Sequence, residues 1–186
     1  AARTQNDDIY CWGSNGNGVC GQGNTTNQYY PVKVAWEIPG TTTRDYNHTW
    51  KTHGGIKKWV CAGVYDQHWM MVLDGNGYLW HVGYNNNGQA FNANTTGNNA
   101  GWKRSEPGTH TYTAPSIATS IGTNLNGKIA DFWTFTCHDS SSTGYNSTYV
   151  RLDDGTTWYA GAGGAHYRHG FGDTAAHTDP VRISKM

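Results

Sequence analysis

A segment rich in glycine and asparagine occurs twice in this chain with identical spacing. Residues 13–26, Gly-Ser-Asn-Gly-Asn-Gly-Val-Cys-Gly-Gln-Gly-Asn-Thr-Thr, align without a gap on residues 83–96, Gly-Tyr-Asn-Asn-Asn-Gly-Gln-Ala-Phe-Asn-Ala-Asn-Thr-Thr. A third, looser copy shares the tail of the first: residues 21–24 and 31–34 match residues 170–173 and 180–183. A repeated unit that is too small to bury its own core is stable only when it stacks on its neighbours. The chain is therefore expected to be a repeat protein of about three units.

Two stretches have the pattern of β-hairpins. Residues 68–73 and 78–82 are apolar runs around Asp74-Gly75-Asn76-Gly77, and residues 148–152 and 156–160 repeat this arrangement around Asp153-Asp154-Gly155. An Asp-Gly turn between apolar runs is a strong local hairpin signal. Two further apolar stretches, 58–63 and 129–135, open the second and third units. Each unit is thus expected to hold about four short strands, which is the makeup of a propeller blade.

An aromatic residue recurs at one position in the strand that precedes each anchoring glycine. Tyr10, Trp80 and Trp158 each stand three residues before that glycine. One residue before it, on the same face of the strand, stand Trp12, Val82 and Ala160. Sheet-on-sheet packing needs such a recurring ring, because each ring buries about 150–250 Å². We interpret these rings as core residues between consecutive sheets rather than as ligand-binding groups.

The chain of 186 residues is expected to form one domain, 1–186, with repeat units at about 1–57, 58–128 and 129–186. The units are unevenly spaced, and the surplus residues fall in two expected loops, roughly 35–57 and 98–128. By alignment, residues 5–8 fall on a hairpin turn whose first strand is missing. Three units are too few for a closed ring. We therefore expect a partial propeller, either as a fragment of a longer chain, which we favour, or closed by association of further copies.

Composition excludes some classes of partner. The formal net charge is zero and only 14% of residues are charged, so no basic face is expected and no nucleic acid partner. No stretch approaches the roughly 18 apolar residues that a membrane span needs. The four cysteines show no paired Cys-x-x-Cys spacing, so neither a disulfide framework nor a zinc site is favoured.

These motifs resemble the repeat of the regulator-of-chromosome-condensation (RCC1) family. That repeat runs as a strand, Asp-Gly, a strand ending in Trp-Gly, Asn-x-x-Gly-Gln-Leu-Gly, a short loop, and Thr-Pro with an apolar pair. Residues 9–23 with Pro31-Val32 match it closely, residues 74–89 match it again, and residues 154–181 match it more weakly because Gly163-Gly164-Ala-His replaces the Asn-x-x-Gly turn. The resemblance implies an all-β fold of RCC1-like propeller blades. It does not imply one activity, since such propellers serve as exchange factors, inhibitors and recognition modules.

No catalytic residue, metal site or cofactor is predicted. His166 and His169 are spaced like metal ligands, but they lie in a glycine-flanked stretch with no cysteine or glutamate nearby to complete a zinc set. His138-Asp139 is the other candidate, and we interpret both as ordinary loop residues. Glu37 and Glu106 are the only two glutamates, which disfavours a paired-carboxylate glycosidase. The chain is not expected to be an enzyme.

The favoured hypothesis is a structural and recognition module of a phage tail fibre or another surface appendage, placed on the virion or extracellular surface. Loops on a rigid scaffold often carry function, and tyrosine- and asparagine-rich loops suit sugar faces and protein epitopes. The predicted contacts are a surface glycan or neighbouring protein subunits. The candidate ligand-binding residues are the aromatic residues of the two expected loops: Trp36, Tyr46, Trp50, Trp102 and Tyr112.

The alternative is a regulatory or inhibitory RCC1-like propeller that binds a protein partner, as a GTPase exchange factor or an enzyme inhibitor, in the cytoplasm. An exchange factor would require complementary charged loops, and the chain shows none. An inhibitor would suit the tyrosines and tryptophans. The two hypotheses agree on a binding role and differ in the partner.

Overall fold

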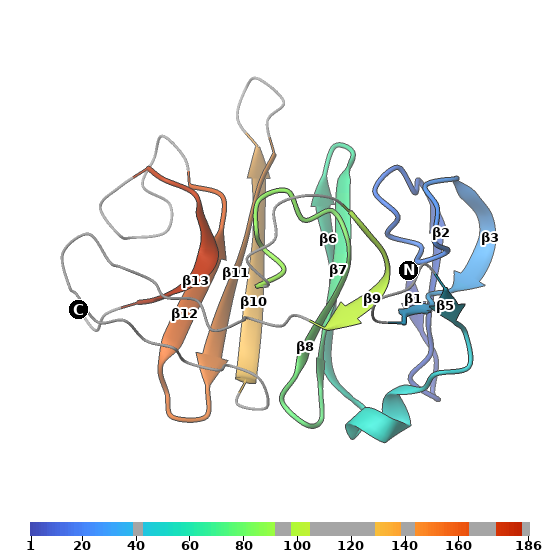
Figure 1. Ribbon diagram of the computed structural model, residues 1–186, viewed down its shortest axis with the longest axis horizontal. Helices are drawn as coiled ribbons and strands as arrows, with labels where there is room; N and C mark the ends of the chain where they lie inside the picture. Colours follow the sequence, from blue (N-terminus) through green and yellow to red (C-terminus); the bar gives the residue numbers. More distant parts are fainter. Residues whose placement is uncertain (39–42, 92–97, 105–128, 139–143, 164–173, 184–186) are drawn as a thin grey trace.

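The computed structural model describes residues 1–38, 43–91, 98–104, 129–138, 144–163 and 174–183. Three mainly antiparallel sheets follow one another along the longest axis of the molecule, in sequence order from the blue end to the orange and red end (Figure 1). We call them blades 1, 2 and 3. Within the described residues, no helix is long and apolar enough to cross a membrane.

Blade 1 is the smallest sheet. It consists of β1 (Ala2–Arg3), β2 (Ile9–Gly13) and β3 (Gln28–Lys33), in that order. The pairing of Ala2 with Tyr10 shows that β1 is a short form of the strand expected before the first turn. The expectation that the first strand of this hairpin is missing is therefore wrong, because two of its residues, Ala2 and Arg3, form β1.

Blade 2 lies in the middle. Its strands are β6 (Ile56–Val64), β7 (Gln67–Asp74), β8 (Leu79–Gly83) and β9 (Asn99–Arg104). Two short strands, β4 (Trp36–Glu37) and β5 (Arg44–Asp45), extend this sheet, because β4 pairs in parallel with β9. A 3₁₀ turn, η1 (Trp50–His53), precedes β6. The described parts of the two expected loops, 35–57 and 98–128, thus contain regular structure. The first holds β4, β5 and η1, and the second holds β9.

Blade 3 consists of β10 (Ile129–His138), β11 (Gly144–Leu152), β12 (Thr157–Gly161) and β13 (His177–Arg182). The predicted hairpins are confirmed as β7–β8 and β11–β12, and the predicted opening strands as β6 and β10. The blades also share one register. Each second-to-last strand ends in a glycine that pairs with the last strand after a register shift: Gly13 with Gln28, Gly83 with Asn99, and Gly161 with His177.

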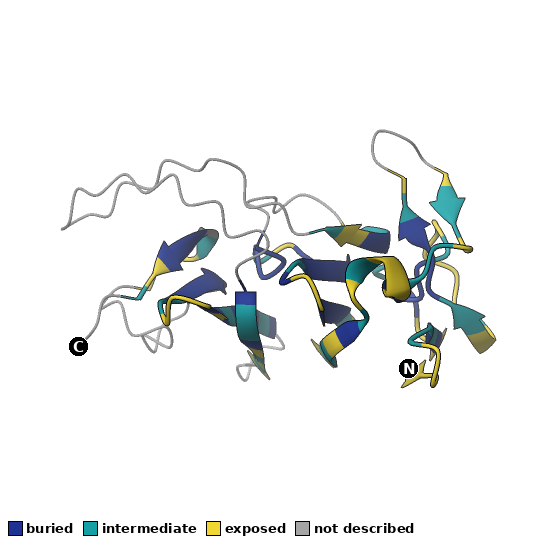
Figure 2. Ribbon diagram, turned by 90° about the horizontal axis from the view of Figure 1, so that it is seen from below, coloured by how far each residue is buried: buried dark blue, intermediate teal, exposed yellow. Residues whose placement is uncertain are grey.

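Alternate residues of blade 2 belong to two different cores. On β7, Met70 and Val72 pack in the core shared with blade 1, whereas Trp69 and Met71 pack in the core shared with blade 3. Successive side chains of a strand point to opposite faces, so this division follows from the strand itself. We call the side of each blade toward the preceding blade its back face and the other side its front face. Buried segments accordingly lie in the strands of all three sheets (Figure 2).

Two of the three recurring aromatic residues lie on the back faces of their blades, in the cores between consecutive sheets, as predicted. Trp12, which precedes the anchoring glycine of the first unit, is 45% exposed, so its interpretation as a core residue is wrong. Trp80 of blade 2 packs in the core shared with blade 1, and Trp158 of blade 3 packs in the core shared with blade 2. Both rings are buried. The strand repeat therefore places one ring between each pair of consecutive sheets.

Candidate functional site

The structure places three of the five predicted ligand-binding rings in the core between blades 1 and 2. Trp36, Trp50 and Trp102 are 5%, 2% and 1% exposed. The expectation that they stand out from surface loops is wrong, because β4 pairs with β9 and sets Trp36 opposite Trp102. Buried rings offer little surface to a ligand. Tyr46 is 44% exposed, and Tyr112 lies outside the described residues.

These buried rings cover the back face of blade 2. The Trp36 ring lies 4.6 Å from that of Trp80 in an edge-on arrangement and 4.3 Å from that of Trp50, and the Trp50 ring lies 5.4 Å from that of Trp102. Edge-on pairs at these distances are favourable beyond the area that they bury. Blade 1 carries only two residues of β1, so these rings supply apolar cover that its short sheet does not. We assign them a structural role.

A buried carboxyl group organises the polar side of this cluster. Asp74 accepts hydrogen bonds from the Trp80 indole N–H at 2.8 Å and from the backbone N–H groups of Asn76 and Tyr78 at 3.0 and 2.9 Å. His53 Nδ1 lies 3.5 Å from Asp74 Oδ2, and His53 Nε2 lies 2.8 Å from His48 Nε2. Burial lowers the pKa of His53, although the charge of Asp74 acts in the opposite direction. The carboxyl group thereby fixes the β7–β8 turn and the Trp80 ring.

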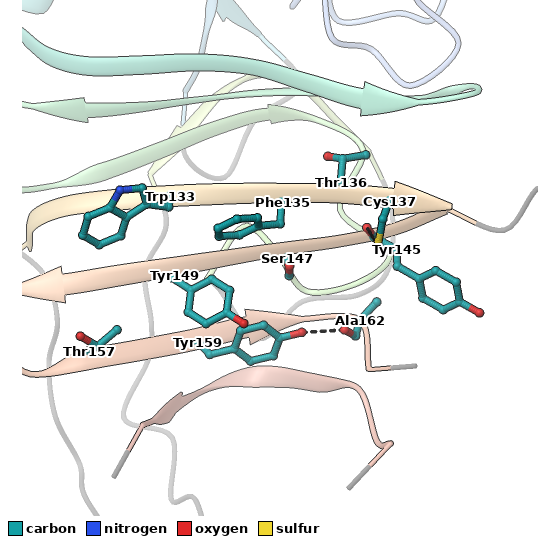
Figure 3. Close-up of a pocket in the computed structure, with 10 residues that line it drawn as sticks. All are labelled: Trp133, Phe135, Thr136, Cys137, Tyr145, Ser147, Tyr149, Thr157, Tyr159 and Ala162. Atoms are coloured by element: carbon teal, nitrogen blue, oxygen red, sulfur yellow. Dashed lines mark hydrogen bonds between the residues drawn. The ribbon is translucent and has the colours of Figure 1, made fainter. Parts of the chain in front are cut away.

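The front face of blade 3 carries a group of aromatic rings at the end of the row of sheets (Figure 3). Trp133 and Phe135 come from β10, Tyr149 from β11 and Tyr159 from β12. We call this surface the open face, because no further sheet follows blade 3 in the described part of the chain. Trp133 is 39% exposed and Phe135 is 55% exposed.

The register explains why this surface is apolar. The Trp133–Tyr149 pair of blade 3 occupies the position of the Val60–Met71 pair in blade 2. In blade 2, Met71 is buried against blade 3 and Val60 packs beside it. The rings of the open face therefore occupy positions that another blade covers in the preceding repeat.

The rings form a ladder across three strands. The Phe135 and Tyr149 rings lie 5.4 Å apart and the Tyr149 and Tyr159 rings 4.9 Å apart, both in edge-on geometry. The Tyr159 hydroxyl donates a 2.6 Å hydrogen bond to the Ala162 carbonyl oxygen, drawn as a dashed line in Figure 3. At one edge, Lys58 Nζ lies 5.2 Å from the centre of the Trp133 ring. The ladder is thus held in place before any partner arrives.

A hollow of about 750 Å³ lies on this face. Its described lining consists of aromatic rings, small side chains, hydroxyl groups and one thiol: Trp133, Phe135, Thr136, Cys137, Tyr145, Ser147, Tyr149, Thr157, Tyr159 and Ala162. Burial raises the pKa of Tyr149, so its phenol is neutral near pH 7. Such a lining suits apolar contact with a few hydroxyl hydrogen bonds.

The sequence pattern identified β10 as a strand but did not mark Trp133 and Phe135 as exposed. A comparison of the repeats, aligned by their shared register, is the signal that could have identified these two rings. Where blade 2 has Val60 and Ala62, blade 3 has two large rings. Among the described residues, no group of three His, Cys, Asp or Glu side chains is arranged to hold a metal ion. Of the histidine candidates, His166 and His169 lie outside the described residues, as does Asp139, and His138 ends β10.

Residues 6–42 match the family model of the regulator of chromosome condensation (RCC1) repeat. A comparison with curated protein sequences finds no match. Similar solved structures include human WBSCR16, with 13% identity and a TM-score of 0.55, covering 97% of this chain and 34% of that one. Yeast RCC1 (Prp20), solved bound to Kap60, has 12% identity and a TM-score of 0.56, covering 98% of this chain and 34% of that one.

A second structure of Prp20p, from Saccharomyces cerevisiae and described with its binding to Gsp1p and histones, has 13% identity and a TM-score of 0.52. It covers all of this chain and 36% of the other, so the chain spans about a third of the length of these proteins. At such identity the likeness shows the fold alone. Nothing in these findings supports a phage tail fibre, a host-attachment protein or a glycan ligand.

Proposed function

Because this chain is an RCC1-like repeat protein whose blades form part of a β-propeller, we propose that it is a non-catalytic module that binds proteins through the open face of blade 3. The similarity to yeast RCC1 (Prp20), which was solved bound to Kap60, supports a protein partner over a glycan. This proposal corresponds to the regulatory or inhibitory alternative, and a cytoplasmic setting goes with it.

The two exposed rings of this face, Trp133 and Phe135, are the observation that carries the proposal. Tryptophan, tyrosine and phenylalanine are enriched in the cores of protein interfaces, where tryptophan and tyrosine often supply most of the binding energy. The ladder also costs little conformational entropy on binding, because ring contacts and the Tyr159 hydrogen bond already fix part of it. Lys58 and Arg151, which lie over the Trp133 ring, place cations at its rim.

Site-specific photocrosslinking tests this proposal. Phe135 is replaced by a photoreactive phenylalanine analogue in one sample, and the exposed Tyr30 of β3 is replaced by the same analogue in a control. After irradiation in extract from the source cells, crosslinked peptides are identified by mass spectrometry. We expect protein crosslinks from position 135 and few from position 30. Equal crosslinking from both positions, or none from 135, would overturn the proposal.

A further inference from the structure

We propose that Cys11 and Cys20 form a reversible disulfide bond that fastens the first glycine-rich turn to strand β2. This modification site lies in blade 1 and goes beyond the proposed function, which concerns blade 3. The two sulfur atoms lie 3.1 Å apart in the structure, where both side chains are thiols. A disulfide bond is about 2.05 Å long, so the two sulfurs need to approach each other by only about 1 Å.

The fold, rather than the spacing in the sequence, brings the two thiols together. Cys11 lies on β2 and pairs with Val32 of β3. Cys20 lies in the glycine-rich turn that follows β2, where its backbone N–H donates a hydrogen bond to the Asn15 side chain. Both cysteines belong to the core between blades 1 and 2, at 4% and 0% exposure. Two thiols without a Cys-x-x-Cys spacing therefore meet in a buried contact.

The second repeat shows that the turn does not need these thiols. At the spacing that aligns the first two units, Cys11 and Cys20 correspond to His81 and Ala90. The Ala90 backbone N–H donates a 2.9 Å hydrogen bond to Asn85, as the Cys20 N–H does to the equivalent asparagine. A small apolar side chain is thus sufficient at this position of the turn. Packing alone does not explain why two thiols meet in the first repeat, which points to chemistry between them.

The contact gives the two sulfurs different roles. The Cys20 thiol donates a hydrogen bond to the Cys11 sulfur. That hydrogen bond lowers the pKa of Cys11 and raises the pKa of Cys20, which burial raises further. The thiolate is the reactive form of cysteine, so Cys11 is the attacking group and Cys20 is the thiol that completes the bond. The oxidant in this proposal is hydrogen peroxide, a small uncharged molecule suited to a buried site.

The oxidation takes two steps. The Cys11 thiolate attacks one oxygen of hydrogen peroxide: an S–O bond forms, the O–O bond breaks, and hydroxide leaves and takes up a proton to become water. Cys20 then attacks the sulfenic sulfur of Cys11: the S–S bond forms, the S–O bond breaks, and hydroxide leaves with the Cys20 proton as a second water. Both sulfurs are oxidised and the peroxide is reduced to water. A dithiol reductant reverses the bond by thiol–disulfide exchange.

The disulfide bond acts on the contact between blades 1 and 2. The turn that holds Cys20 also holds Gly18, where an added Cβ would lie 2.8 Å from the Ala100 Cβ of blade 2. A covalent link between β2 and this turn removes conformational freedom from the unfolded chain. Blade 1 is the smallest sheet, and its first strand, β1, has only two residues. Oxidation therefore stabilises blade 1 and holds its turn in place against blade 2.

Peptide mass spectrometry of the full chain tests the bond. The reduced protein is treated with hydrogen peroxide, unfolded, alkylated at its remaining thiols and digested with trypsin. Cleavage after Arg3 and Lys33 releases residues 4–33, which contain Cys11 and Cys20 and no other cysteine. We expect this peptide to escape alkylation and to be lighter than its reduced form by two hydrogen atoms. Alkylation of both cysteines, their oxidation to oxyacids without a bond, or a disulfide from either one to Cys61 would overturn the proposal.

Thermal unfolding measures the effect of the bond. Oxidation should raise the melting temperature by about 5–10 °C, as expected for a short closed loop in a chain of this size, and a dithiol reductant should reverse the rise. Cys20→Ala should abolish the rise and still fold, because Ala90 stands at this position in blade 2. Cys61→Ser, which removes the exposed thiol of β6, is the control and should keep the full rise. No rise in the unaltered chain, or one that survives Cys20→Ala, would contradict the stabilising role of this bond.

Discussion

At the scale of single residues, two buried asparagines make equivalent hydrogen bonds in two repeats. The Asn15 side-chain oxygen accepts a 2.8 Å hydrogen bond from the Cys20 backbone N–H, and the Asn85 side-chain oxygen accepts one of 2.9 Å from that of Ala90. Asn15 Nδ2 also donates to the Asn24 and Thr26 carbonyl oxygens, each at 3.0 Å. The repeated asparagine thus replaces a backbone partner inside a tight, buried turn. The third unit has Gly163 at this position, which accounts for its weaker match to the motif.

We expect Asn15→Ala to lower the free energy of unfolding by about 1–3 kcal/mol, because it leaves the buried Cys20 N–H without a partner. Chemical denaturation measures this. Asn24→Ala is the control, since the Asn24 side chain is exposed, and it should change stability by no more than about 0.5 kcal/mol. Equal effects of the two variants would contradict the assigned role of Asn15.

His81 makes the stability depend on pH. Its Nε2 lies 2.9 Å from the Tyr84 carbonyl oxygen and its Nδ1 lies 3.1 Å from Asn99 Nδ2, so the neutral ring donates from Nε2 and accepts at Nδ1. Complete burial lowers the pKa of His81 to about 3. The unfolded chain binds this proton near its ordinary pKa of about 6.5 and the folded chain does not. The contribution of His81 to stability is therefore fully present above about pH 6.5 and is lost as the pH falls toward 3.

We predict a loss approaching about 1.4 kcal/mol per pH unit from His81 in the lower part of this window. His81→Gln removes the titrating group and keeps a donor and an acceptor. The difference in unfolding free energy between the two proteins, measured from pH 7 to pH 4, should narrow or reverse with acid. Parallel curves would show that His81 does not titrate on unfolding.

At the scale of elements, a glycine turn of each of the first two blades docks on the last strand of the next blade. A Cβ at Gly18 would lie 2.8 Å from the Ala100 Cβ of blade 2, and a Cβ at Gly88 would lie 2.6 Å from the Thr178 Cα of blade 3. Both glycines have φ of +73°, a conformation that other residues adopt at a cost. The repeated turn therefore also makes the contact between consecutive blades, which explains why its spacing is identical in both units.

Gly88→Ala should lower the unfolding free energy by more than about 1 kcal/mol, because it combines left-handed strain with a backbone clash. Gly16→Ala is the matched control: a Cβ there meets nothing within 4 Å and its φ is not in the left-handed region. Thermal unfolding of the two variants gives the comparison. If Gly88→Ala and Gly16→Ala have the same melting temperature, the turn at Gly88 does not pack against blade 3 as described.

Sequence patterns predicted the strands that carry local signals and missed those that depend on distant partners. The Asp74-Gly75 turn and its apolar flanks were sufficient for β7 and β8. The strand β9 was missed because its sequence, Asn-Ala-Gly-Trp-Lys-Arg, lacks the Pro-Val pair of the other units and is fixed by pairing with β8. Trp36 was misplaced for the same reason, since only the β4–β9 contact shows that it turns inward.

At the scale of the whole molecule, one packing rule accounts for both the core and the binding surface. Each front face is apolar because the next blade covers it, and the last front face remains apolar where no described sheet follows. The two internal cores differ in composition. The first is closed by tryptophans around Trp80, and the second includes a hydrogen bond of 3.2 Å from the Trp69 indole N–H to Asn146. The apolar character of the open face thus follows from the repeated structure of the blades.

Amide hydrogen exchange of β7 tests this packing most directly. Residues 69–73 of β7 are fully buried, because blade 2 is covered by blade 1 on its back face and by blade 3 on its front face. We predict that the β7 amides exchange most slowly of all strands, and only through global unfolding, whereas those of β2 exchange faster because blade 1 is covered on one face. Exchange of β7 as fast as that of β2 would contradict the face-to-face stacking of the three sheets.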